Sequence, residues 1–128
     1  MKRILFVDDE PLLLEVIEAR LEERADEWEM DFAGDADAAL NLMTRNSYDV
    51  IVVDRRMPGM NGAELLALVR QNHPGTMRIM MSGVSEESPS PGPSELAHQY
   101  LSKPCNLDDL EAAIDQTLKR REILLSRA

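Results

Sequence analysis

Two hydrophobic patterns alternate along the chain, and each predicts a different kind of element. Continuous apolar runs occupy Ile4–Val7 and Val50–Val53, and a weaker run occupies Arg78–Met81. Runs without alternation are typical of parallel strands that are covered on both faces. Apolar and acidic residues alternate over residues 28–32, which indicates a strand with one face in water, and residues 99–101 form a short strand-like run. These last two segments are therefore predicted to be the edges of a sheet.

Helical patterns fill the intervals between the strands. Pro11 suits the first position of a helix, Asp35 is a common N-cap residue, and Asn61 followed by Glu64 resembles a capping box. Asn106 is expected to start the last helix in a similar way. The apolar positions predicted to face the core are Leu13, Val16, Ile17 and Leu21 in the first helix, Ala36, Ala39, Leu40 and Met43 in the second, and Leu107, Leu110, Ala113, Ile114 and Leu118 in the last.

The alternation of strands and helices predicts an α/β fold in one domain, residues 1–128. Such strands form a doubly wound parallel sheet with right-handed crossovers, and with the second and fifth strands at the edges the order 2-1-3-4-5 fits best. Residues 88–93 break the pattern, because the three prolines of Ser-Pro-Ser-Pro-Gly-Pro cannot propagate a helix. We therefore expect a disrupted fourth helix, with residues 88–93 in an extended or mobile loop.

The composition narrows the possible functions. The 128 residues carry a formal net charge of −10 and are 44% hydrophobic, which is too apolar for a disordered chain and too acidic for a protein that binds nucleic acid through a basic surface. No apolar run is long enough to cross a bilayer. The one cysteine, Cys105, excludes an internal disulfide and a cysteine-rich zinc site. We expect a cytoplasmic domain that binds neither nucleic acid nor membrane.

Charged and polar residues follow the predicted strands at their carboxyl ends. Asp8 and Asp9 follow the first strand, Asp54 the third, Ser82 the fourth and Lys103 the fifth. In an open parallel sheet these ends lie near the edge where ligands bind. Any one of these residues alone could be a helix cap, a turn residue or a solvated charge, but their joint placement makes coincidence a poor explanation.

This set of side chains suits phosphoryl transfer assisted by a divalent metal. Clustered carboxylates repel one another unless a cation joins them, and Mg²⁺ prefers oxygen ligands, including phosphate oxygens. Asp8 and Asp9 would hold the metal, and Asp54, which follows an all-apolar strand, would be the nucleophile. The Ser82 hydroxyl and the Lys103 ammonium would bind and neutralise the phosphoryl oxygens.

Four motifs, in order and at family spacing, resemble those of the response regulator receiver domain of two-component signalling. They are Val7–Pro11, Asp54–Gly62, Ser82–Gly83 and Lys103–Pro104, and the resemblance covers nearly the whole chain. The resemblance implies a flavodoxin-like fold. It also implies that Asp54 accepts a phosphoryl group from a sensor histidine kinase or a phosphotransfer protein, and that the domain is a signalling switch rather than an enzyme.

The resemblance also implies a ligand set and a type of full-length protein. It places Mg²⁺ on Asp8 or Asp9, on Asp54 and on the backbone carbonyl of Arg56. The segment 98–105 is similar to receivers that are fused to HDOD output domains. We therefore expect a downstream output domain or output protein.

The family pattern assigns further roles to three residues. Tyr100 matches the aromatic residue whose rotamer reports phosphorylation, although packing at the sheet edge would explain it equally well. Arg56 and Val84 occupy the positions that flank the attacking water, and neither offers a carboxylate or an amide, so slow autodephosphorylation is expected. The basic residues 119–121 and the apolar residues 123–125 suit contact with a partner or a following domain, or equally a solvated helix end.

Two other functions stay open on the sequence alone. A receiver-like interaction module would keep the fold without using phosphate, but the intact Asp54 and Lys103 argue against it. A phosphohydrolase of the haloacid dehalogenase type also uses a strand-end aspartate and Mg²⁺. Such an enzyme needs a second acid two residues after the nucleophile, where this chain has Arg56. A phosphorylation-operated switch is therefore the leading interpretation.

Overall fold

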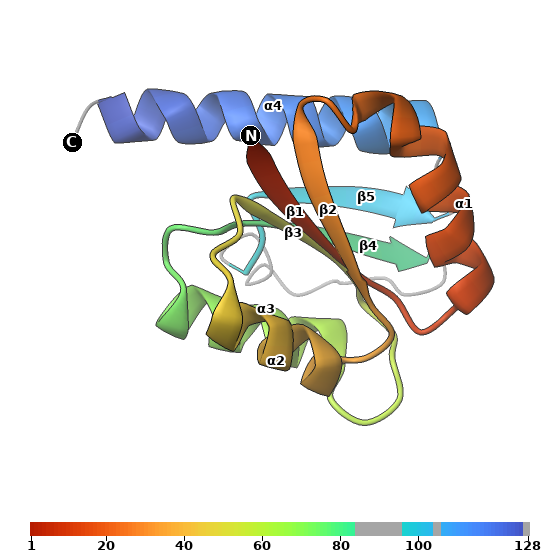
Figure 1. Cartoon of the computed structure of the whole chain (residues 1–128). Coiled ribbons are helices and arrows are strands. Elements are labelled where there is room, and N and C mark those ends of the chain that lie inside the picture. Colours follow the sequence, from red (N-terminus) through yellow and green to blue (C-terminus); the bar gives the residue numbers. More distant parts are fainter. Residues whose placement is uncertain (84–95, 104–105, 127–128) are drawn as a thin grey trace.

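The computed structural model describes residues 1–83, 96–103 and 106–126. In these residues strands and helices alternate along the chain as far as β4, and β5 and α4 follow (Figure 1). The strands are β1 (Lys2–Val7), β2 (Trp28–Ala33), β3 (Val50–Asp54), β4 (Met77–Gly83) and β5 (Gln99–Lys103). The helices are α1 (Pro11–Leu21), the short 3-10 helix η1 (Glu22–Arg24), α2 (Ala36–Arg45), α3 (Gly62–Asn72) and α4 (Leu107–Ser126).

The described strands form one parallel sheet in the order β2-β1-β3-β4-β5. Helices α1 and α4 cover one face of the sheet, and α2 and α3 cover the other (Figure 1). The predicted doubly wound α/β architecture and its strand order are confirmed. The pairing also aligns the carboxyl ends of the strands, since Asp54 is in register with Met81 and Lys103 with Gly83.

The core lies on both faces of β1 and β3. Leu5 and Val53 belong to an apolar cluster with residues of α2 and α3, whereas Phe6 and Val52 belong to a cluster with residues of α1 and α4. Each of these four side chains is at most 1% exposed. Because β1 and β3 are packed on both sides, the residues that follow them are held at fixed positions.

The predicted helix starts are confirmed by their hydrogen bonds. The Asp35 carboxylate accepts a bond from the backbone N–H of Ala38 at 2.7 Å at the start of α2. At the start of α3, Asn61 and Glu64 form the reciprocal bonds of a capping box, at 2.9 and 3.0 Å. The Asn106 side chain accepts a bond from the backbone N–H of residue 109 at 2.7 Å before α4.

One predicted core position in α1 was wrong. Val16 is 52% exposed, while Ile17 and Leu21 are buried and Leu13 packs against the same core cluster. Leu13, Ile17 and Leu21 recur every four residues, so they follow one line along the helix and fill its inward face. Val16 lies on the neighbouring face, which the sheet does not reach.

Some sequence predictions lie outside the described residues. They concern the proline-rich segment 88–93, Val84 and Cys105. Among the helices that the structure describes, none combines the length and the apolar character needed to cross a membrane.

Candidate functional site

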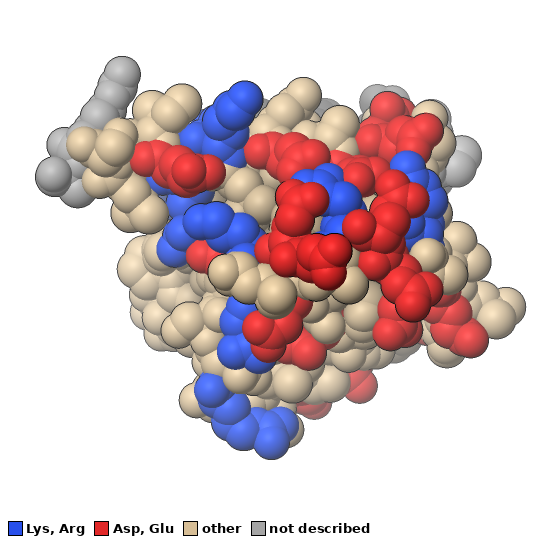
Figure 2. Space-filling model, turned by 45° about the horizontal axis from the view of Figure 1, so that its top comes forward, with Lys and Arg blue, Asp and Glu red and all other residues tan. Residues whose placement is uncertain are grey.

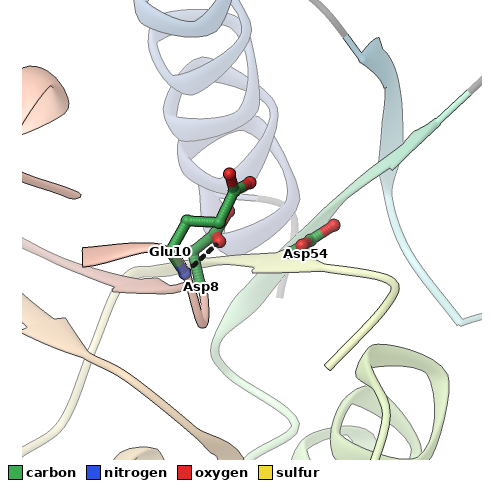
Figure 3. Close-up of side chains that lie close together, drawn as sticks. All are labelled: Asp8, Glu10 and Asp54. Atoms are coloured by element: carbon green, nitrogen blue, oxygen red, sulfur yellow. Dashed lines mark hydrogen bonds between the residues drawn. The ribbon is translucent and has the colours of Figure 1, made fainter. Parts of the chain in front are cut away.

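Three of the predicted site residues meet at the carboxyl edge of the sheet. Asp8 directly follows β1, Asp54 ends β3 and Lys103 ends β5. Figure 3 shows the carboxylates of Asp8 and Asp54 at neighbouring strand ends, with Glu10 beside Asp8. The sheet order brings these groups together although 95 positions separate Asp8 from Lys103 in the sequence.

Lys103 is the cation that holds these carboxylates together. Its Nζ atom lies 3.2 Å from Oδ2 of Asp54, 3.4 Å from Oδ2 of Asp8 and 3.5 Å from Oε1 of Glu10. The side chains of Asp8 and Asp54 are only 1% and 6% exposed, whereas that of Glu10 is 64% exposed. The site therefore has two nearly buried carboxylates at its base, one solvent-exposed carboxylate at its opening, and an ammonium group between them.

Burial raises the proton affinity of both inner acids. It raises the pKa of Asp8, because desolvation outweighs the hydrogen bond from the backbone of Glu10 and the attraction of Lys103. Burial and the charge of Asp8 raise the pKa of Asp54 as well. Burial opposes the charge of Lys103, but the nearby carboxylates outweigh it and raise the pKa of this ammonium. The cluster is therefore short of positive charge, which favours the binding of a further cation.

Backbone contacts fix the direction of each inner carboxylate. The N–H of Glu10 donates to Oδ1 of Asp8 at 2.9 Å, and the backbone of Arg56 donates to the carboxylate of Asp54. The loop after Asp54 returns closely on itself, since the N–H of Gly62 donates to the carbonyl of Arg55 at 2.9 Å. A side chain at position 62 would collide with the Asp54 carbonyl, because a Cβ there would lie 2.3 Å from that oxygen.

The acids of this site fit a divalent metal ion. One carboxylate oxygen each from Asp8, Glu10 and Asp54 lies within 4.8 Å of the other two. Mg²⁺ takes oxygen ligands, needs only one or two protein carboxylates, and keeps several of its waters. The open side at Glu10 leaves room for such waters and for phosphoryl oxygens, and the shortage of positive charge supplies the attraction.

Glu10 is the member of this cluster that the sequence analysis missed. It is the N-cap of α1, yet its side chain makes no capping hydrogen bond and lies beside Lys103 instead. A glutamate is a poor N-cap residue, and its place two positions after Asp8 was the available signal. Asp9 is exposed and lies outside the cluster formed by the described residues, so its role as a metal ligand stays a prediction.

The other predicted residues lie around this centre. Ser82 is half-buried in β4, in register with Ser102 of β5. Tyr100 is 37% exposed on β5, and burial raises the pKa of its phenol. The side chain of Arg56 is exposed. The functions assigned to these side chains therefore stay predictions.

Comparison with known proteins identifies the family of this fold and site. The family model described as "Response regulator receiver domain" matches residues 4–115. The chain is a response regulator receiver domain. Receiver domains are signalling modules of two-component systems, and the acids at the strand ends of this receiver domain lie where such a module carries its phosphorylation site.

Curated relatives of this receiver domain are regulators from several bacteria. It is 31% identical over 121 residues to the response regulator ArlR of Staphylococcus saprophyticus, and the alignment covers 94% of this chain and 54% of ArlR. It is 34% identical over 118 residues to the hydrogenase transcriptional regulatory protein HoxA of Cupriavidus necator, and the alignment covers 91% of this chain and 24% of HoxA. The receiver domain thus spans about half or less of these relatives' length.

Solved structures share the fold over nearly the whole receiver domain. A chain of an adenylate cyclase from Rhodopirellula baltica superposes with a TM-score of 0.89 at 29% identity, covering 98% of this chain and 93% of that one. The response regulator protein TrrA from Thermotoga maritima, solved in complex with Mg(2+)-BeF, superposes with a TM-score of 0.79 at 31% identity, covering 91% and 99%.

Proposed function

We propose that this domain is a switch in which Asp54 accepts a phosphoryl group from the phosphohistidine of a sensor histidine kinase or a phosphotransfer protein. A carboxylate oxygen of Asp54 attacks the phosphorus, the bond to the histidine nitrogen breaks, and the imidazole leaves. The observation that carries this proposal is the contact between Asp54 and Lys103, 3.2 Å apart at the end of the central strand.

The surroundings of Asp54 suit a nucleophile towards phosphorus. The carboxylate is nearly buried, so few waters compete with an incoming phosphoryl group. The charge of Lys103 lowers the pKa of Asp54 and so opposes the effect of burial, and its ammonium is placed to neutralise phosphoryl oxygens as they approach. The half-buried Ser82 hydroxyl, on the strand between them, would donate a hydrogen bond to the same oxygens.

The acids beside Asp54 would hold Mg²⁺ during the transfer. Asp8 and Asp54 supply inner carboxylates, Glu10 lies within reach, and Asp9 and the backbone carbonyl of Arg56 are the further predicted ligands. When bound, the ion neutralises charge that builds up on the phosphoryl oxygens. The backbone N–H of Glu10 orients Asp8 towards this position.

We further propose that phosphorylation changes the surface near Tyr100, through the Ser82 loop, and so acts on an output domain or protein. The length of the curated relatives supports a longer natural protein. An HDOD output domain stays a prediction that rests on residues 98–105. We expect the receiver to cover residues 1–128, to work in the cytoplasm, and to bind no nucleic acid itself.

Slow loss of the phosphoryl group is also part of this proposal. Neither Arg56 nor Val84 can orient an attacking water through a carboxylate or an amide. A time course of phosphate release should show that the variant Arg56→Asn, Val84→Glu loses phosphate faster than the wild type. Equal rates would contradict this account of turnover.

Labelling with acetyl phosphate and Mg²⁺ tests the acceptor directly. We expect one phosphoryl group per chain by intact-mass spectrometry, stable in acid and removed by hydroxylamine, and none on Asp54→Asn. Asp35→Asn is the matched control, because asparagine caps a helix as well as aspartate does, and it should label like the wild type. Labelling of Asp54→Asn at the wild-type rate would overturn the assignment. Failure of the wild type to label would favour a phosphate-independent interaction module.

A further inference from the structure

We propose that two copies of this chain associate by placing the C-terminal end of α4 of each copy in a groove between α1 and β2 of the other. The groove and the helix end are both exposed, both partly apolar, and opposite in local charge. This contact is separate from the phosphorylation site and does not depend on the modification of Asp54.

The groove has an apolar floor. It is a hollow of about 530 Å³ between the outer side of α1 and the edge strand β2. Its apolar lining comes from Ala19 of α1, from Ala25, and from Trp28, Met30 and Phe32 of β2. The small side chains of Ala19 and Ala25 leave space beside the larger side chains of β2, so the hollow can admit a side chain of leucine size.

The rim of the groove is acidic. Glu15, Glu18 and Glu22 line it from α1 and η1, and none of the three forms an ion pair with another described residue. Figure 2 shows acidic side chains crowded over the part of the molecule where α1 lies. A segment that binds in the groove should therefore carry both positive charge and apolar side chains.

The end of α4 offers this combination. Arg121 attaches α4 to the body of the domain, donating to the carbonyl of Gly75 at 2.9 Å and pairing with Asp49 at 2.9 Å. Beyond it, the helix projects past the sheet (Figure 1). The projecting side chains Ile123, Leu124 and Leu125 are 50%, 54% and 56% exposed.

Positive charge lies one helical turn before these apolar residues. Lys119 and Arg120 are exposed and precede Ile123 and Leu124 by four positions, so they share the same sides of the helix. Lys119 forms no ion pair with another described residue, and Arg120 uses one nitrogen to bind the carbonyl of His98. Both charges are therefore placed to face the glutamates of a groove that receives Leu124.

The groove borders α1, whereas the end of α4 projects past the sheet, so the two surfaces do not overlap and a closed dimer is permitted. The first turns of α4 pack against the helix that borders the groove, through the contact of Arg20 with Asp108 and Glu111. The last turns lie near Asp49, at the other end of the sheet. Two antiparallel α4 helices, each about 30 Å long, would bring each end to the other copy's groove. A twofold arrangement satisfies both contacts at once and leaves no open end.

Sedimentation velocity over a range of concentrations tests the proposal on the unphosphorylated chain. We expect a concentration-dependent dimer for the wild type and a dissociation constant raised roughly tenfold or more by Leu124→Glu. Ala19→Arg, which fills the groove, should weaken the dimer to a similar degree. Leu12→Glu is the matched control, because Leu12 is an exposed leucine of α1 that does not line the groove, and it should leave the dimer intact.

A mixture of two variants identifies the contact. Leu124→Glu keeps its groove and Ala19→Arg keeps its helix end, so the mixture should form a heterodimer through one remaining contact, more tightly than either variant alone forms a homodimer. Circular dichroism of each variant checks that it is folded. A monomeric wild type at all concentrations would overturn the proposal. So would a dimer that Leu124→Glu weakens and Ala19→Arg does not, since the helix end would then bind elsewhere.

Discussion

Gly62 packs so closely against Asp54 that a Cβ on residue 62 would lie 2.3 Å from the Asp54 carbonyl oxygen and 2.8 Å from the Cα of Arg55. Both neighbours are backbone, so neither can rotate away as a flexible side chain would. The first turn of α3 and the end of β3 can therefore pack this closely only because residue 62 has no side chain.

Gly62→Ala should therefore lower the free energy of unfolding by about 3 kcal/mol, because the backbone must shift to admit the methyl group. The same shift should displace Asp54 and slow its labelling by acetyl phosphate. Gly34→Ala is the control, since a Cβ at position 34 meets nothing within 4 Å. Urea unfolding that gives both variants the wild-type stability would contradict this contact.

Removal of the shared cation should destabilise the metal-free domain. Lys103→Ala leaves Asp8 and Asp54 nearly buried without their ammonium partner. We expect a loss of about 2 kcal/mol, less than for a fully buried pair because Lys103 is partly exposed. Urea unfolding measures the loss, and the additional change Asp8→Asn should restore part of it by removing one of the two repelling charges. A double variant less stable than Lys103→Ala alone would show that repulsion is not the cause.

Asp8→Asn alone should stabilise the metal-free domain, by about 1 kcal/mol at neutral pH. The folded pKa of Asp8 is raised, so its ionised form is less favourable in the folded chain than in the unfolded chain. The contribution of Asp8 to the free energy of unfolding is therefore fully present below the pKa that Asp8 has in the unfolded chain. It is lost as the pH rises through the higher pKa that Asp8 has in the folded chain. Without metal, the wild type should gain stability relative to Asp8→Asn as the pH is lowered towards that pKa.

With Mg²⁺ present, the wild type should become more stable than Asp8→Asn. At a concentration of 100 times its dissociation constant, a bound ion stabilises the folded state by about 2.7 kcal/mol. Thermal unfolding should show this gain in the wild type and in Asp35→Asn, and a much smaller gain in Asp8→Asn. An equal gain in thermal stability of Asp8→Asn on addition of Mg²⁺ would show that Asp8 is not a metal ligand.

Arg24 should account for much of the attachment of α4 to η1. Its guanidinium lies 3.9 Å from the centre of the Trp28 ring and pairs with Glu111 at 2.7 Å and with Asp115 at 2.9 Å. Arg24→Ala should cost about 2 kcal/mol, and Arg24→Lys less, because lysine keeps the charge but not the planar fork. Fluorescence of Trp28, the one tryptophan, follows unfolding. Arg45→Ala, on the exposed end of α2, should change little.

Tyr48 should make the fold sensitive to alkali. Burial and the Asp31 carboxylate, which accepts its hydroxyl at 2.6 Å, raise the pKa of Tyr48 to about 12. A tyrosine in the unfolded chain ionises near 10, so stability from Tyr48 is present below that pH and lost as the pH rises towards 12. Ultraviolet titration of the Tyr100→Phe variant, which leaves Tyr48 as the one tyrosine, checks the value. An ionisation near pH 10 in the folded protein would contradict this environment.

The fold could be predicted because its strongest signals are periodic. The central strands are apolar on both faces, the edge strand β2 alternates, and Asp35 and Asn61 mark helix starts by their own hydrogen bonds. The same logic placed Asp8, Asp54 and Lys103 together, since residues that follow parallel strands meet at one edge.

Other features depend on tertiary contacts that no periodicity encodes. Glu10 belongs to the cluster only because its side chain lies beside Lys103 instead of capping α1. Val16 has the spacing of a core residue, yet it falls on a face that the sheet does not cover. The contact of Arg24 with Glu111 joins residues 87 positions apart. Such pairings follow from how the helices are placed on the sheet.

The place of Lys103 on the last strand has a consequence for how the protein matures. One inner acid follows β1 and the other ends β3, and both strands are made early. The ammonium that the two acids share reaches them only when β5, at the far edge of the sheet, has docked. Closing so long a stretch of chain is slow and entropically costly. A nascent or partly unfolded chain therefore holds its acids without their counter-ion. A chain that ends before β5 lacks Lys103 altogether, so we expect it to label poorly at Asp54.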